Sequence, residues 1–195
     1  MKLVETTYDN AETGCCARLD VAKWDAREFE WKDKLFLKDH IRAVMHIPLN
    51  TGAVMGRDQH AIEAAAAYPD DPLWLSDEVS PWGSDIYIAV DHPVPNTETV
   101  TLSGRFLTKV FEGPYRDIGK WIKAMDAYVE ARGEHTRRHL FYYATCPRCA
   151  KHFGKNQVVL FAEVAGTATA VGTATAVGTA RGAGTATAAG TATAG

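Results

Sequence analysis

The chain has 195 residues, with 21 Lys and Arg against 24 Asp and Glu, which gives a net charge of −3 at neutral pH. This balance leaves no basic surplus for binding nucleic acid. The aromatic and charged residues outside the C-terminal tail are those of a globular domain with a sizeable core, which excludes a disordered protein, a membrane protein and a disulfide scaffold.

The two ends of the chain differ from its middle. Residues 1–10 lack the apolar stretch of a secretory signal, so we expect a cytoplasmic protein that does not bind a membrane. Residues 1–34 are rich in charge, and we expect an irregular lead-in whose Trp24 and Trp31 pack on the main body. Residues 165–195 repeat GTATAV-type hexads with too few large side chains for a core, which predicts a disordered tail.

The segment from residue 35 to residue 91 contains the first of two similar patterns. Apolar residues alternate along residues 35–47, which predicts a half-buried strand. An alanine-rich helix is expected at residues 53–67. Short alternating segments predict strands at residues 73–77 and 85–91, with a turn between them.

The same order recurs from residue 100 onward. Alternation predicts a strand at residues 100–111, and Gly113 and Pro114 end it. A helix follows, because apolar residues recur at helical spacing: Ile118, Trp121, Ile122, Met125 and Val129. Two further strands are expected at residues 139–145 and 156–164.

The order β-α-β-β therefore occurs twice. We expect residues 35–164 to form one α+β domain in which two such modules join into a single antiparallel sheet, with both helices on one face. A ligand pocket is expected on the other face or between the modules.

Several short motifs carry a resemblance to a known family. They are TGCC at residues 13–16, KLF at 34–36, HIPLN at 46–50, LSDE at 75–78, WG at 82–83, FLTKVFEGPY at 106–115 and CPRCAK at 146–151. In this order they resemble a family of small bacterial proteins described as hydrolases, which in turn resembles the GyrI-like small-molecule-binding domains. The chain departs from the family pattern at Ala17, where a Pro is expected, and in its hexad tail.

The resemblance has implications for fold and function. It implies a duplicated strand–helix–two-strand fold with a central pocket for an organic ligand. Some relatives bind hydrophobic drugs, and others hydrolyse reactive cyclopropane-bearing compounds. The Gly-Pro-Tyr that opens the second helix of the family corresponds to Gly113, Pro114 and Tyr115. We therefore expect a small organic ligand and no organic cofactor.

Four cysteines occur as two tight pairs, Cys15 with Cys16 and Cys146 with Cys149. Four thiolates from two distant segments are a ligand set for a tetrahedral structural zinc. Adjacent cysteines strain joint coordination, and His152 is an alternative ligand. A redox-active or reactive thiol pair and simple packing are the other interpretations, and the sequence does not decide among the three.

Candidate catalytic groups must be sought among the carboxylates. The chain has no G-x-S-x-G nucleophile elbow and no H-E-x-x-H motif. Hydrolysis would then need a carboxylate that orients water. Asp85 and Glu112 are the candidates, because each borders a strand beside an aromatic ring, where lost hydration raises a carboxyl pKa. A solvated charge at a strand end is the alternative for each.

Aromatic side chains are the expected walls of the pocket. The candidate ligand-binding residues are Trp82, Tyr87, Tyr115 and Tyr143. We expect them to line one cavity with Asp85 or Glu112, and we place His40 in solvent or at the pocket rim. The first functional hypothesis is hydrolysis of a hydrophobic or electrophilic organic compound. The alternatives are a non-catalytic protein that binds, sequesters or senses such a compound, and a zinc or thiol protein.

Overall fold

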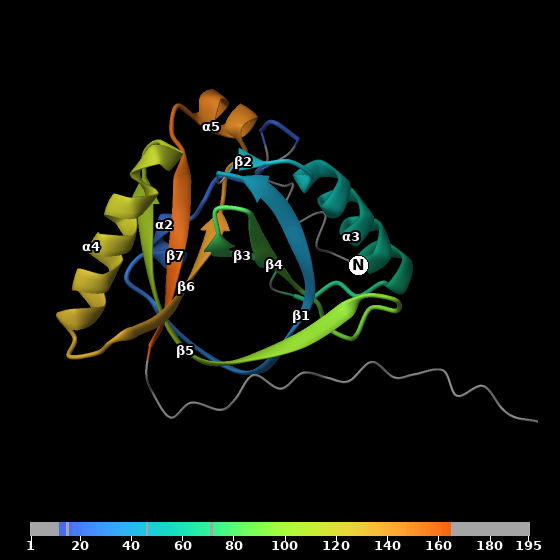
Figure 1. Ribbon diagram of the computed structural model, residues 1–195, viewed down its shortest axis with the longest axis horizontal. Coiled ribbons are helices and arrows are strands. Elements are labelled where there is room, and N and C mark those ends of the chain that lie inside the picture. Colours follow the sequence, from blue (N-terminus) through green and yellow to red (C-terminus); the bar gives the residue numbers. More distant parts are fainter. Residues whose placement is uncertain (1–11, 15, 46, 71, 165–195) are drawn as a thin grey trace, which may run out of the picture.

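The computed structural model describes residues 12–14, 16–45, 47–70 and 72–164, and Figure 1 shows their arrangement. The predictions for Cys15 and for the tail at residues 165–195 lie outside the described residues. The elements are α2 (Val21–Trp24), β1 (Glu28–Val44), β2 (Ile47–Pro48), α3 (Thr51–Ala65), β3 (Trp74–Ser80), β4 (Gly83–Ala89), β5 (Glu98–Glu112), the 3-10 turn η1 (Tyr115–Asp117), α4 (Ile118–Glu130), β6 (Thr136–Tyr143), α5 (Pro147–Phe153) and β7 (Gln157–Val164).

The described strands form one antiparallel sheet that closes on itself. In it β1 lies beside β4, then come β3, β6, β7 and β5, and β5 pairs with β1 to complete a six-stranded barrel. The short β2 adds to the far end of β1. Figure 1 shows α3 and α4 outside the barrel on opposite sides. The fold is mixed α and β with an antiparallel sheet, as predicted. The prediction of a single layer with both helices on one face is wrong, because the sheet closes into a barrel with α3 and α4 on opposite sides.

The length and bend of β1 explain this closure. β1 has 17 residues; it pairs with β5 along residues 28–38 and with β4 along residues 36–42. Its register to β5 shifts between Trp31 and Lys34, where Asp33 has a positive φ of 51°. Such a bulge bends a strand and increases its twist. The sequence predicted that this strand begins at residue 35. In that case residues 28–31, which pair with Gly104–Leu107 of β5, would lie outside the sheet.

Leaving the short elements α2, β2, η1 and α5 aside, the described elements repeat the order β-α-β-β. In each set the first strand pairs with the third, as β1 with β4 and β5 with β7. The second strand also pairs with the third, as β3 with β4 and β6 with β7. The sets meet through β1–β5 and β3–β6, so each set contributes equivalent edges to the barrel.

Alternation along the strands divides the apolar side chains between the two sides of the barrel wall. Phe36, Phe106 and Phe161 have no exposed surface and belong to a core cluster with members from all six strands, which is the barrel interior. Leu37 and Leu160, one position along, face outward beneath α3 and α4. Burial of each such side chain stabilises the fold by about 1.5–3 kcal/mol.

The two long helices cover the outside of the barrel. α4 buries Trp121, Met125 and Val129 against β5, β6 and β7, which confirms the face predicted from helical spacing. α3 buries Val54, Asp58 and Ile62. No helix in the described part of the chain combines the length and apolar character needed to cross a membrane.

The aromatics of the predicted lead-in are packing residues, as expected. The Trp24 ring centroid lies 5.8 Å from that of Phe161, and the Trp31 centroid lies 4.3 Å from that of Phe106. Both rings pack against the interior cluster. The segment is more regular than predicted, because α2 and the first part of β1 both fall within it.

Candidate functional site

A groove with a volume of about 680 Å³ lies between α3 and β1. Pairing of β1 with β5 ends at Lys38 and Glu98, and the groove opens at this point beside residues 95–97. We call it the α3 groove. The charged or titratable side chains that line it include Lys38, His40, Arg57, Asp58, Asp85 and Glu98.

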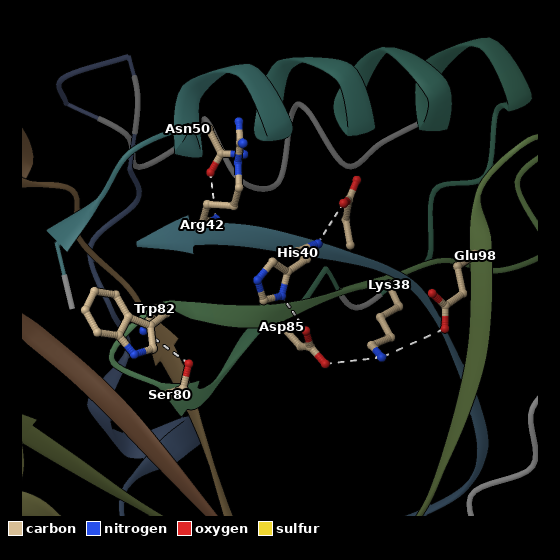
Figure 2. A network of polar contacts seen from close by, with 9 residues as sticks. Lys38, His40, Arg42, Asn50, Ser80, Trp82, Asp85 and Glu98 are labelled. Carbon is tan, nitrogen blue, oxygen red and sulfur yellow. Dashed lines mark hydrogen bonds and ion pairs between the residues drawn. The ribbon is translucent and has the colours of Figure 1, made fainter. Parts of the chain in front are cut away.

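Asp85 is the centre of the polar network in the α3 groove (Figure 2). Its Oδ1 lies 2.7 Å from His40 Nδ1, and its Oδ2 lies 3.2 Å from Lys38 Nζ. Lys38 Nζ lies 3.9 Å from Glu98 Oε1. The strand register produces this arrangement, because His40 is directly opposite Asp85 and Lys38 is opposite Glu98.

The network keeps Asp85 anionic. Burial raises the pKa of Asp85, but the hydrogen bonds from His40 and Lys38 outweigh it and hold the pKa below its ordinary value. A carboxylate only accepts hydrogen bonds, so His40 Nδ1 carries the proton in this pair and Nε2 is left as an acceptor. The result is a His–Asp pair whose Nε2 lies beside the backbone of Gly83.

The His40 ring lies close to the backbone of Gly83. A Cβ on Gly83 would be 2.3 Å from His40 Nε2 and 2.8 Å from the Ile41 carbonyl oxygen. Any side chain at position 83 would therefore displace the imidazole. Gly83 is needed for the observed position of His40.

A pair of acidic side chains, Asp39 and Asp58, lines the groove beside α3. Asp58 is 1% exposed, and its Oδ2 has no hydrogen-bond partner among the described residues. Burial and the neighbouring Asp39 carboxylate raise the pKa of Asp58 to about 6, although Arg57 Nε lies 3.5 Å from Asp58 Oδ1. Arg57 also pairs with Asp39. The pKa of Asp39 lies below its ordinary value, because the His40 backbone N–H and Arg57 together outweigh the effect of its burial.

The raised pKa of Asp58 predicts a pH-dependent stability. Because the folded pKa exceeds the ordinary value of 3.8, the stabilisation is full below pH 4 and is lost as the pH rises through about 6. Asp58→Asn mimics the protonated carboxyl. We expect equal melting temperatures of variant and wild type near pH 4, and a variant more stable by on the order of 5 °C at pH 8. Exposed Asp70→Asn is the control, and parallel curves for Asp58→Asn and wild type would contradict the expectation.

The structure brings three of the four cysteines together. The Sγ atoms of Cys16, Cys146 and Cys149 all lie within 4.8 Å of one another, close enough to bind one metal ion. Thr13 Oγ1 is 3.0 Å from Cys149 Sγ, and the Cys146 N–H donates to Cys16 Sγ at 3.4 Å. The hydrogen bond with Thr13, with further ones to the other two cysteines, lowers the pKa of Cys149 to about 6 against the effect of burial. This cysteine cluster lies outside the α3 groove.

Residues 6–164 match the model of a family described as Bacterial hydrolase. The chain belongs to this family. No curated protein matches the chain.

Solved structures from Listeria innocua share the fold of this chain. One hydrolase superposes with a TM-score of 0.52 at 13% identity, and an uncharacterized conserved protein with a TM-score of 0.54 at 14% identity. Both alignments cover 71% of this chain and 91% of the other. A second hydrolase gives a TM-score of 0.53 at 12% identity, covering 73% of this chain and 93% of its own. At these identities the likeness shows the fold alone.

The two carboxylates predicted as catalytic lie in different places. Asp85 lines the α3 groove, whereas Glu112 is exposed at the end of β5, where its Oε2 lies 3.5 Å from Gln157 Nε2. The structure therefore brings Asp85, and not Glu112, together with other titratable groups of the groove.

The four predicted aromatics do not share a cavity with Asp85, since none of them, all described, is among the residues that line the α3 groove. Trp82 is 62% exposed in the β3–β4 turn, and Tyr87 belongs to the barrel core. Tyr115 and Tyr143 lie together, with ring centroids 5.7 Å apart. The Tyr143 hydroxyl donates to Glu78 at 3.0 Å, and burial raises the pKa of Tyr143.

Sequence reasoning missed Asp58 and placed His40 in solvent or at a pocket rim. A signal for Asp58 was present, because it stands midway between Val54 and Ile62 on the buried face of α3. A carboxylate at an apolar helical position is costly unless it is protonated, paired or functional. No comparable signal marks His40, whose partner Asp85 is 45 residues away in the sequence.

Proposed function

We propose that this member of the bacterial hydrolase family binds a small organic molecule in the α3 groove and hydrolyses it without an organic cofactor. Family membership supports hydrolysis as the reaction class. The single observation that carries the site is the His40–Asp85 pair, whose atoms lie 2.7 Å apart in the groove. The equivalent pairing of the two β-α-β-β sets supports a GyrI-like module arrangement.

The groove favours a ligand without net charge. Lys38 is paired with Asp85 and Glu98, and Arg57 is paired with Asp39 and Asp58, so a charged ligand would have to break an existing ion pair. Ala61, Ala64 and Ala65 of α3 offer a small apolar wall. A neutral, partly apolar compound with an electrophilic carbon fits this lining.

The proposed reaction uses His40 as the general base. Nε2 takes a proton from water while the water oxygen bonds to the electrophilic carbon of the substrate. The imidazolium then gives that proton to the leaving group as the scissile bond breaks. The sequence predicted Asp85 as a catalytic acid. In the proposed reaction Asp85 is a positioning residue, which holds the His40 tautomer and stabilises the charged form of His40. Lys38 is a cation near the developing negative charge.

Turnover and binding across a panel of neutral esters, epoxides and cyclopropane-bearing electrophiles test this function. Ala64→Trp should fill the groove and weaken binding of the best compound at least ~10-fold. Ala53→Trp, also exposed on α3 but outside the groove lining, is the matched control and should leave binding unchanged.

The outcomes separate the functional alternatives. Turnover that is lost in Ala64→Trp and kept in Ala53→Trp supports the proposal. Binding without turnover across the whole panel would overturn hydrolysis and favour a binding or sensing protein. Equal effects of the two substitutions would overturn the α3 groove as the site.

A further inference from the structure

The short helix α5 has almost no apolar surface with which to hold its position. It has seven residues, and Cys149 is the one that is buried. Phe153 is half-buried, with the Arg18 guanidinium 4.5 Å from its ring centroid. A helix of two turns is marginal in water without tertiary packing. Polar contacts, such as the 3.4 Å pair of His152 Nε2 with Glu12 Oε2, join α5 to the N-terminal segment, and a further interaction between the two would stabilise both.

The thiols meet at the point where that interaction is needed. Cys146 stands at the start of α5, Cys149 is one turn further on, and Cys16 comes from the N-terminal segment. Tetrahedral zinc with Zn–S bonds of about 2.3 Å requires sulfur atoms about 3.8 Å apart. The observed spacing, within 4.8 Å for every pair, needs only a small closing movement.

We propose that Cys16, Cys146 and Cys149 bind one zinc ion as thiolates, and that this ion fastens residues 16–18 to α5. The three thiols release their protons to solvent on binding, so the affinity rises with pH. The cysteine cluster supplies three ligands without reference to Cys15, which lies outside the described residues. Soft thiolate ligands select zinc over hard cations such as magnesium and calcium.

A redox-active pair fits the same residues less well. A dithiol that exchanges with other proteins needs an accessible thiol. Cys149 has no exposed surface, Cys146 is half-buried, and the Cys16 thiol lies within 4.8 Å of both. Three sulfur atoms that converge from two segments, one of them enclosed, are typical of metal coordination.

Metal analysis of the full chain, purified under reducing conditions from zinc-supplemented medium, is the first test. We expect one zinc per chain, and no stoichiometric iron or copper. Cys146→Ser and Cys149→Ser should each lose the metal. Ile62→Val, which trims a buried side chain of α3 away from the cysteines, is the matched control and should retain it despite a lower melting temperature.

Chelation provides a readout that is independent of activity. A strong zinc chelator should lower the melting temperature of wild type and of Ile62→Val by about 10 °C, and re-addition of zinc should restore it. The same chelator should not change the melting temperature of the two cysteine variants. A metal-free wild type that zinc does not stabilise would overturn the proposal, as would a mass lower by two hydrogens that shows a Cys146–Cys149 disulfide. Neither result would affect the assignment of the α3 groove.

Discussion

Asp85→Asn is expected to lower kcat by at least ~100-fold while the dissociation constant of the substrate stays nearly unchanged. The carboxylate lies behind the imidazole, 2.7 Å from His40 Nδ1. An amide in its place can donate to Nδ1, which favours the tautomer that carries its proton on Nε2. The base is then lost although the groove keeps its shape. Steady-state kinetics with the best compound of the panel, together with calorimetric binding, measures both effects.

A double variant tests whether Asp85 acts through His40. If Asp85 acts through His40, the double variant His40→Gln/Asp85→Asn should be no slower than His40→Gln alone. Glu112→Gln is the matched control, since it makes the same chemical change on an exposed strand end outside the groove. Full additivity of the two losses, or a similar loss in Glu112→Gln, would contradict the assigned roles.

Phe161→Ala is expected to lower the free energy of unfolding by about 3–5 kcal/mol. The ring has no exposed surface and lies at the centre of the barrel, with the centroids of Trp24, Phe29 and Trp31 at 5.8, 5.9 and 5.7 Å. These rings come from α2 and β1 and have little freedom to collapse into the space that the substitution leaves. Urea denaturation, with the slope compared between proteins, measures the change.

Two further variants show whether burial of the Phe161 ring is the cause of the lower free energy of unfolding. Phe161→Leu keeps much of the apolar volume and should cost clearly less. Leu49→Ala removes a side chain that is 65% exposed and should change the free energy by no more than about 0.5 kcal/mol. Equal losses in Phe161→Ala and Leu49→Ala would show that the barrel interior does not carry the stability.

Local pattern alone determined the identity of most elements. The spacing of Trp121, Met125 and Val129 predicted α4 and its buried face, because helical periodicity depends only on residues within a few turns. Alternation likewise identified the strands, and their order predicted the β-α-β-β repeat. The element boundaries were less accurate. β1 begins at Glu28 because a charged, aromatic-rich segment becomes regular only when β5 pairs with it.

Closure of the barrel and the composition of the site depended on tertiary structure. β1 pairs with β5 on both sides of a bulge between Trp31 and Lys34, and the bend of this bulge has no counterpart in hydrophobic alternation. The pairing of His40 with Asp85 and the meeting of Cys16 with Cys146 and Cys149 join segments far apart in the chain. Such contacts follow from strand register and from the path of the chain around the barrel. A sequence pattern with a period of two or 3.6 residues shows which face a side chain occupies, but not which distant side chain lies opposite it.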